Sequence, residues 1–482
     1  TVSAKDGGGF GGNISTSGTL AVTGTSTLTG NVTAAGTLAV TGNSTFSGDI
    51  IKSTSGTSNF AAGVNAGNSI ASGGNYNVVI GDEAGTALTT GDFNVAVGFE
   101  ALATEDANGN ATAIGYRALK TLNAGTESYN SGVGYQAGTS ITTGINNTLV
   151  GAFVGDALTD ADHNTALGLS ALGADTLGSK SVAIGYNALG ADTKGDRAVA
   201  IGLNALSSQN FTTSTDTHNT AVGYKAGNAV TTGKNNTLIG SLAGDALTVG
   251  NTNTVIGKDA LSADTQGDRA TAIGNGALAS QNFTTSTDNY NIGVGYFSGN
   301  VVTTGIRNVI VGANSGLALT DADYNCTLGY AALTTDTQGS GSVAIGYKAL
   351  QTQNFTTASF SYNTAVGYNA GLAVTTGTSN TLVGAHAGDA ITTGADNVAI
   401  GSFALSAEDT TGRNIAIGRN SLLLANSTSG NANNVAVGYN TGASVTTGTK
   451  NVFIGSFCGD ATDDGEENTA VGYGALSANA GG

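Results

Sequence analysis

The sequence predicts an all-β fibre whose main part is a parallel β-roll or β-solenoid, and three observations lead to this fold class. The phrase Asn-(Thr/Val)-Ala-(Val/Ile)-Gly-Tyr-x-Ala-(Gly/Leu) recurs 23 times, and its glycines run from Gly81 to Gly472. Successive glycines are nearly always 17 residues apart. The apolar positions keep the same register in every copy. A period below about 20 residues is too short for a helix pair but fits one coil of a β-solenoid.

Each copy carries the signal of one short strand. The residue before the phrase glycine is Val, Ile or Leu in all 23 copies, and the residue two positions earlier is usually Val or Thr. A β-branched pair at period 2 is typical of a strand with both larger side chains on one face. We expect the residue before the glycine to face the core, which gives the predicted structural core: Ile80, Val97, Ile114, Val222, Ile239, Ile256, Ile273 and Val294.

Two further positions of the phrase predict the corners of the coil. Asn opens 18 of the copies, and stacked Asn side chains can hydrogen-bond from coil to coil and cap the start of each strand. The phrase glycine permits the positive φ that a tight corner requires. Tyr follows this glycine in ten copies, and a packed external ladder of rings is the favoured interpretation over sugar stacking.

The coils group into blocks of four. From Gly223 onward the last phrase residue runs Gly, Gly, Leu, Leu, and the pattern repeats after 72 residues. Each block ends in a longer loop with the sequence Gln-Asn-Phe-Thr-Thr. Loops with an unexplained aromatic residue are the best candidates for binding, although a Phe that folds back and seals the roll is an equal alternative. The candidate binding residues are Asn210, Phe211, Asn282, Phe283, Asn354 and Phe355.

The N-terminal part has a different period and completes the predicted organisation. Residues 1–12 contain three consecutive glycines and suggest a flexible lead-in. In residues 13–60 glycines recur every six residues, which suits short strands wound with two partner chains in a triple β-helix-like segment. Residues 61–76 are expected to be a connector, and residues 77–482 the β-roll. One coil offers little apolar volume, so we expect a homotrimer that buries the remaining aliphatic surface.

Composition excludes several functions. The formal net charge of −17 gives no electrostatic basis for nucleic-acid binding. The sequence contains no run of 18 apolar residues, so direct membrane insertion is not predicted. The three histidines lie in unrelated contexts, so no catalytic residues and no enzyme activity are predicted. The acidic run from Asp460 to Glu467 lacks the spacing of a calcium loop. We therefore predict no metal site and no cofactor.

The repeat resembles two groups of known proteins. The Asn-(Thr/Val)-Ala-(Val/Ile)-Gly phrase is similar to the coils of the YadA-like trimeric adhesin head, which is a parallel β-roll. The longer form, residues 219–227 followed by Thr231-Thr232-Gly233, looks more like repeats of phage tail-fibre proteins that carry a self-cleaving C-terminal chaperone. The coils are longer than those of the adhesin head, and neither a heptad stalk, a membrane barrel nor a chaperone domain occurs in the sequence.

These observations favour a structural and attachment fibre. We expect an extracellular homotrimer, part of a phage tail fibre or another virion appendage, that presents a multivalent face to a cell-surface glycan or protein receptor. One alternative is a cell-surface adhesin of the trimeric autotransporter type. Another is a solenoid that binds ice or a crystal surface through a flat Thr array, but Thr pairs such as Thr89-Thr90 occur on only some coils.

Overall fold

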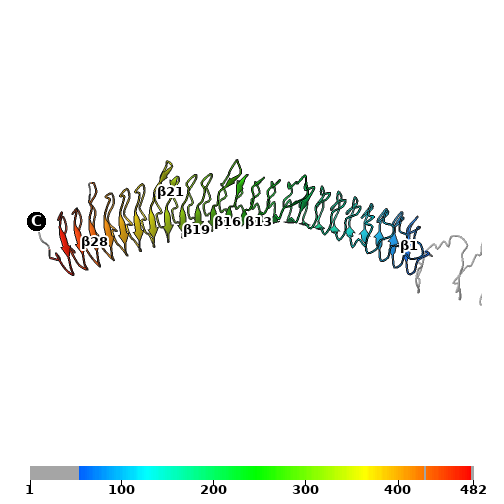
Figure 1. The fold of residues 1–482 in the computed structure, drawn as a ribbon, viewed down its shortest axis with the longest axis horizontal. Coiled ribbons are helices and arrows are strands. Elements are labelled where there is room, and N and C mark those ends of the chain that lie inside the picture. The colour runs from blue at the N-terminus through cyan, green and yellow to red at the C-terminus, as the bar shows by residue number, and fades with distance from the viewer. Residues whose placement is uncertain (1–53, 428–429, 479–482) are drawn as a thin grey trace, which may run out of the picture. The chain divides into compact units, whose positions relative to one another are not determined.

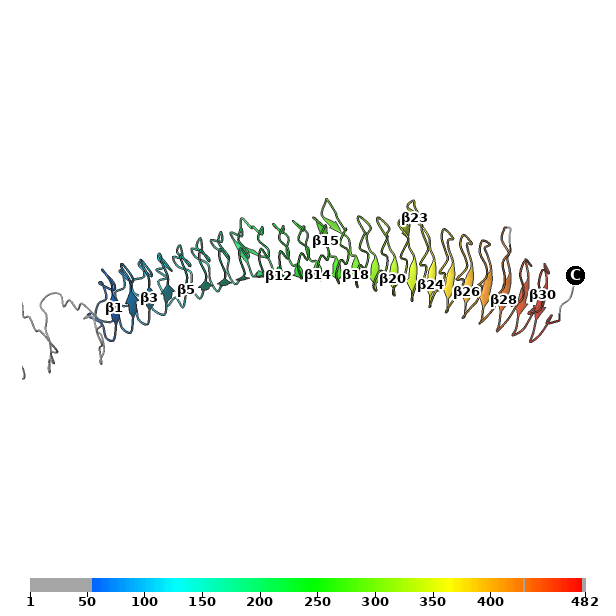
Figure 2. The ribbon, with the colours of Figure 1, turned by 180° about the vertical axis from the view of Figure 1, so that it is seen from behind.

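The computed structural model of the chain describes residues 54–427 and 430–478. The chain divides into two compact units, Thr1–Ile50 and Ile51–Gly482. The predicted lead-in and nearly all of the six-residue-period segment lie outside the described residues. The second unit is an all-β parallel solenoid whose main sheet has 24 strands. Its coils follow one another in sequence order along one row (Figures 1 and 2).

Each coil contributes one strand of three residues to the main sheet. These strands are β1 (Phe60–Ala62), β2 (Val78–Ile80), β3 (Val95–Val97), β4 (Thr112–Ile114), β5 (Ser131–Val133), β6 (Thr148–Val150), β7 (Thr165–Leu167), β8 (Val182–Ile184), β10 (Val199–Ile201), β12 (Thr220–Val222), β13 (Thr237–Ile239), β14 (Thr254–Ile256), β16 (Thr271–Ile273), β18 (Ile292–Val294), β19 (Val309–Val311), β20 (Cys326–Leu328), β22 (Val343–Ile345), β24 (Thr364–Val366), β25 (Thr381–Val383), β26 (Val398–Ile400), β27 (Ile415–Ile417), β28 (Val435–Val437), β29 (Val452–Ile454) and β30 (Thr469–Val471).

Neighbouring strands pair in parallel with no shift, so equivalent residues form columns. In β12 and β13, Ala221 lies beside Leu238, and the flanking residues pair in the same way. The stack begins one coil before residue 77, because β1 pairs with β2. The expected connector, residues 61–76, is therefore part of a coil.

The predicted register of the core is wrong. The central residue of each strand faces inward, and the two outer residues face out of the coil; Ala221 and Leu238 are fully buried. The predicted core residues occupy the third strand position: Ile80, Ile114, Ile239 and Ile256 are 36–38% exposed, and Val97, Val222, Ile273 and Val294 are half-buried. The coil is too narrow to hold two inward side chains per strand, so only the central residue faces the opposite wall.

The wall of the coil opposite the strand contributes two positions to the core, and the sizes of their side chains compensate each other. We call the residue six positions after the strand centre the turn position, and the residue nine positions after it the lining position. Where the turn position is Gly, the lining residue is aliphatic, and its side chain occupies the space that a turn side chain would take. A Cβ on Gly155 would lie 2.7 Å from Cδ1 of Leu158. Where the turn position is Leu, the lining residue is Asp, Glu or Gln. The exceptions among the described coils are Leu122, Ala425 and Thr462.

Buried Asn side chains hold successive coils together, which confirms the predicted Asn ladder. The backbone N–H of Asn236 donates to Oδ1 of Asn219 at 3.0 Å, and Oδ1 of Asn236 accepts the N–H of Asn253 at 3.0 Å. Its Nδ2 donates to the carbonyl of Gly250, 14 residues later, at 2.9 Å. One side chain thus links its coil to the next coil and closes the loop of its own coil.

Replacing Asn236 by Ala should lower the free energy of unfolding by roughly 2–5 kcal/mol. The change leaves the N–H of Asn253 and the carbonyl of Gly250 buried without their partners, and each such group costs about 1–3 kcal/mol. Urea unfolding followed by circular dichroism measures the loss. Lys234→Ala, an exposed change in the same coil, should shift the free energy by less than about 0.5 kcal/mol. Equal midpoints for the two variants would contradict a structural role of the ladder.

Candidate functional site

Three loops, each in a coil four residues longer than the regular 17-residue coil, form the first candidate surface. We call residues 210–217, 282–289 and 354–361 the tongues. Each tongue adds a short strand that pairs in parallel with the preceding coil: β11 (Thr215–Asp216) with β9 (Gly195–Asp196), β17 (Thr287–Asp288) with β15 (Gly267–Asp268), and β23 (Ser359–Phe360) with β21 (Gly339–Ser340). The labels β15, β21 and β23 mark loops that project beyond the neighbouring coils in Figures 1 and 2.

The Phe side chain of each tongue is folded back, so its prediction as a binding residue is wrong. Phe211, Phe283 and Phe355 are 6%, 6% and 9% exposed. A buried Asp of the preceding coil fixes each of them: the N–H of Phe283 donates to Oδ1 of Asp264 at 3.1 Å. Burial raises the pKa of Asp264, and a hydrogen bond from Gln281 opposes this shift. These Phe residues seal the roll, the second of the two readings that the sequence left open.

The predicted Asn residues also have structural partners. Oδ1 of Asn210 accepts a hydrogen bond from Thr193 at 2.8 Å, and Asn282 and Asn354 accept equivalent bonds from Thr265 and Thr337 at 3.0 and 3.2 Å. The tips of the tongues, residues 212–214, 284–286 and 356–358, are all exposed, and so are Asn210 and Asn282. These tips carry hydroxyl groups and no charge. Two tongues have an ion pair at their base, Arg197 with Asp216 and Arg269 with Asp288.

Replacing Phe283 by Ala should release its tongue without unfolding the stack. The tongue loses its only buried aromatic side chain, while the main-sheet pairing of β16 does not depend on it. Hydrogen exchange should then be at least about tenfold faster in residues 284–288, since the variant removes more than 1.4 kcal/mol of local burial. Exchange in Thr271–Ile273 should stay unchanged. Thr284→Ala, at the exposed tip, is the control, and unchanged exchange in the Phe283→Ala tongue would refute the clamp.

The outward side of the main sheet is the second candidate surface. We call the first and third residues of its 24 strands the sheet face. None of these residues is charged, and from β2 to β30 the third residue is always Val, Ile or Leu. Many of these side chains remain more than a third exposed, among them Leu167 at 47%, Leu328 at 48% and Ile454 at 41%. A continuous apolar column of this length makes the sheet face a candidate interaction surface.

Aromatic ladders run along the edges of the sheet face. Beyond the glycine corner, Tyr116 and Tyr135 stack at 5.0 Å between ring centroids, and Tyr347 stacks on Tyr368 at 5.1 Å. At the other edge Tyr76 stacks on Phe93 at 5.1 Å. The predicted external ladder is thereby confirmed in separate runs of coils, but it does not continue along the whole stack. Because stacked rings cover each other's faces, the ladders present ring edges and tyrosine hydroxyls to solvent.

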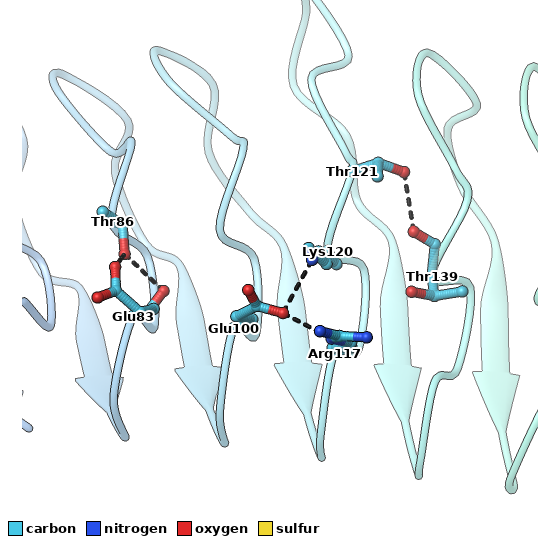
Figure 3. Close-up of polar contacts among 7 residues, drawn as sticks. All are labelled: Glu83, Thr86, Glu100, Arg117, Lys120, Thr121 and Thr139. Carbon is cyan, nitrogen blue, oxygen red and sulfur yellow. Dashed lines mark hydrogen bonds and ion pairs between the residues drawn. The ribbon is translucent and has the colours of Figure 1, made fainter.

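The returning part of the coil is polar. Figure 3 shows Oε2 of Glu100 accepting hydrogen bonds from Nε of Arg117 at 2.6 Å and from Nζ of Lys120 at 2.8 Å. The bond from Lys120 is the main reason why the pKa of Glu100 is lowered. Farther along, Thr121 donates to the carbonyl of Thr139 at 2.8 Å, while Thr86 bonds within its own coil to Glu83. The polar side chains drawn in Figure 3 therefore bond to one another and to backbone carbonyls of the same wall.

One of the three histidines, His386, has structural neighbours. Nδ1 of His386 bonds to Asp389 at 2.7 Å, and its ring stacks on Phe403. This His is part of the aromatic ladder. In residues 54–427 and 430–478 no group of three or more His, Cys, Asp or Glu side chains could hold a metal ion. The same ranges contain no helix long and apolar enough to cross a membrane.

The comparisons with known proteins add no identification. No protein-family model, curated protein or solved structure matches this chain.

Proposed function

We propose that this chain is a structural and attachment fibre, in which identical copies associate through the sheet face as a parallel homotrimer. The observation that carries the proposal is the uncharged aliphatic column that continues from β2 to β30. Such a surface requires a partner that is apolar along the same length. On a chain of net charge −17, the sheet face is where copies can approach without bringing charged side chains together.

A second copy of the chain fits this surface better than an unrelated protein. The sheet face repeats with the spacing of the coils, about 4.8 Å. A parallel copy placed around a symmetry axis brings the same residue types to the same height along its whole length. The tyrosine edges of the ladders then lie at the rim of the contact, where amphipathic side chains suit a polar boundary. Three copies, as the six-residue glycine period of the N-terminal segment suggests, enclose the apolar faces.

The tongues give the fibre its attachment surface. They recur every four coils, which places them about 19 Å apart along the stack. In a trimer their exposed hydroxyl tips form repeated sets of three, so weak contacts with a cell-surface glycan or protein receptor add through effective concentration. A virion appendage such as a phage tail fibre needs this combination of stiffness and multivalency. An adhesin of the trimeric autotransporter type uses the same parts on a cell surface and remains the alternative.

One observation bears on the ice- or crystal-binding alternative. The first strand position is Thr in four consecutive coils, Thr220, Thr237, Thr254 and Thr271. The column then continues with Ile292, Val309 and Cys326, so the hydroxyl array ends after four coils. The other column of the sheet face, the third strand position, is aliphatic, so this surface suits contact with another protein better than contact with ice or a crystal.

Placing two charges in the sheet face should abolish association. Ile239→Lys with Ile256→Lys puts two ammonium groups on adjacent coils of each copy, where burial without partners costs several kcal/mol. Light scattering with in-line chromatography should show three chains for the unmodified protein and a single chain for the variant. Thr232→Lys with Gln266→Lys adds the same charge outside the sheet face and should leave the trimer intact. A single-chain mass for the unmodified protein would refute self-association.

Cys326 gives an independent test of the register. It is the first residue of β20 and is partly exposed on the sheet face, whereas Cys458 is buried inside the coil. A bifunctional thiol-reactive linker should therefore join copies through Cys326, with crosslinked dimers on a denaturing gel. Cys326→Ser should remove the product, and Cys458→Ser should not. No crosslinked dimer from the unmodified trimer, or a product that persists in the Cys326→Ser variant, would contradict the parallel in-register arrangement.

Shortening the tongues should separate folding from attachment. Deleting the four extra residues of each tongue should leave the trimer folded, since closing shorter loops changes the entropy by well under about 1 kcal/mol. The shortened fibre should lose attachment in a binding assay with fluorescently labelled fibre on bacterial cells and on a glycan array. Unchanged attachment, with an unchanged trimer mass, would make the tongues spacers and move the attachment site to another surface.

A further inference from the structure

The lining column of the core contains buried acids that the fibre function does not use. Each lies in a coil whose turn position is Leu, and each is at most 1% exposed. Where the acid is Asp, its carboxylate accepts the N–H of the residue three positions later; the bond from Gly178 to Oδ1 of Asp175 is 2.7 Å long. The members are Glu105, Asp175, Asp192, Asp264, Asp336 and Glu408.

An amide in the following coil satisfies three of these acids. Nε2 of Gln209 donates to Asp192 at 2.5 Å, Nε2 of Gln281 to Asp264 at 2.6 Å, and Nε2 of Gln353 to Asp336 at 2.5 Å. The Oε1 atom of each Gln then accepts Nδ2 of an Asn in the ladder, as Gln281 does from Asn291 at 2.8 Å. The pattern Asp then Gln therefore completes a buried polar network.

Asp175 breaks this pattern. The equivalent residue of the following coil is Asp192, which is also an acid, so no amide donor is present. Oδ2 of Asp175 is buried and has no hydrogen-bond partner. This is the one place in the described lining column where two acids occupy consecutive coils.

The surroundings of Asp175 disfavour its charge. The preceding coil places Leu158 at the lining position, and Lys180 of the same coil points to solvent. Burial is the largest cause that raises the pKa of Asp175 to about 7; the N–H of Gly178 opposes the shift, and Asp192 and Asp196 of the next coil add to it. No cation faces the pair. A protonated Asp175 carries the O–H donor that this site lacks.

We propose that Asp175 and Asp192 form a proton-dependent latch inside the stack. The coils of β7 and β8 hold together tightly while Asp175 keeps its proton, and they loosen locally when the proton leaves. Since the pKa of Asp175 in the folded chain lies above its unfolded value of 3.8, the contribution to stability is fully present below the unfolded value and is lost as the pH rises through about 7. The segment around β7 and β8 thus responds to neutral pH.

Hydrogen exchange of the full chain at pH 5.5 and pH 8.5, corrected for the intrinsic chemical rate, tests the latch. A pKa of about 7 implies that local opening around β7 and β8 increases about 30-fold over this range. The coils of β12 and β13, whose lining residues are Val230 and Leu247, should change far less. A wild-type profile in which both regions respond equally would overturn the proposal.

Asp175→Asn provides the matched variant. The amide keeps an acceptor for Gly178 and supplies a permanent donor, so protection around β7 and β8 should no longer depend on pH. Asp216→Asn, an exposed change, should retain the wild-type response. If Asp175→Asn keeps the full pH dependence, Asp175 is not the responsible group. The wild-type comparison decides the question alone if this variant does not fold.

Discussion

The whole stack depends on one column of glycines at the corner after each strand. Their φ angles lie between +123° and +147°, a range that residues other than glycine rarely adopt. A Cβ on Gly223 would lie 2.5 Å from the carbonyl oxygen of Gly240 in the next coil. No neighbour can move away, because that oxygen belongs to the next corner. Only glycine therefore lets the corners approach as closely as the hydrogen bonds between parallel strands require, and these bonds keep the other columns in register.

The narrow coil that follows from this corner explains how far the sequence could be interpreted. Period, strand positions, the Asn ladder and the four-coil blocks are all visible in the repeat, because each depends on residues within one or two coils. The repeat does not show which side of the strand faces inward. Both Ala221 and Val222 are apolar, and the deciding factor is the opposite wall, where Leu206 and its equivalents adopt a left-handed backbone conformation with φ of about +50°. The conformational preferences of Leu give no reason to expect it at a position with a left-handed backbone conformation.

For the surfaces, too, the sequence indicates where a feature lies but not which way its side chains point. The tongues could be located from the insertions alone, but the direction of Phe283 depends on a buried acceptor, Asp264, in the preceding coil. A usable signal was present in the sequence. Leu at the turn position is followed three residues later by Asp, Glu or Gln, whereas Gly is followed there by Ile, Leu or Val. This pairing shows that the side chains of the turn position and the lining position fill the same space in the core. The strand centre is then the third position that faces inward, and its two neighbours in the strand face outward.

The hydrogen bonds between coils point along the stack, and this direction decides how the chain responds to tension. A pull on the two ends loads the ladder of one terminal coil at a time, as in opening a zipper, instead of shearing all strands together. Each coil that opens exchanges a rise of about 4.8 Å for 17 residues of extended chain, which adds about 50 Å of length. A stack of such coils can lengthen several-fold and dissipate a sudden load stepwise while its remaining coils stay folded.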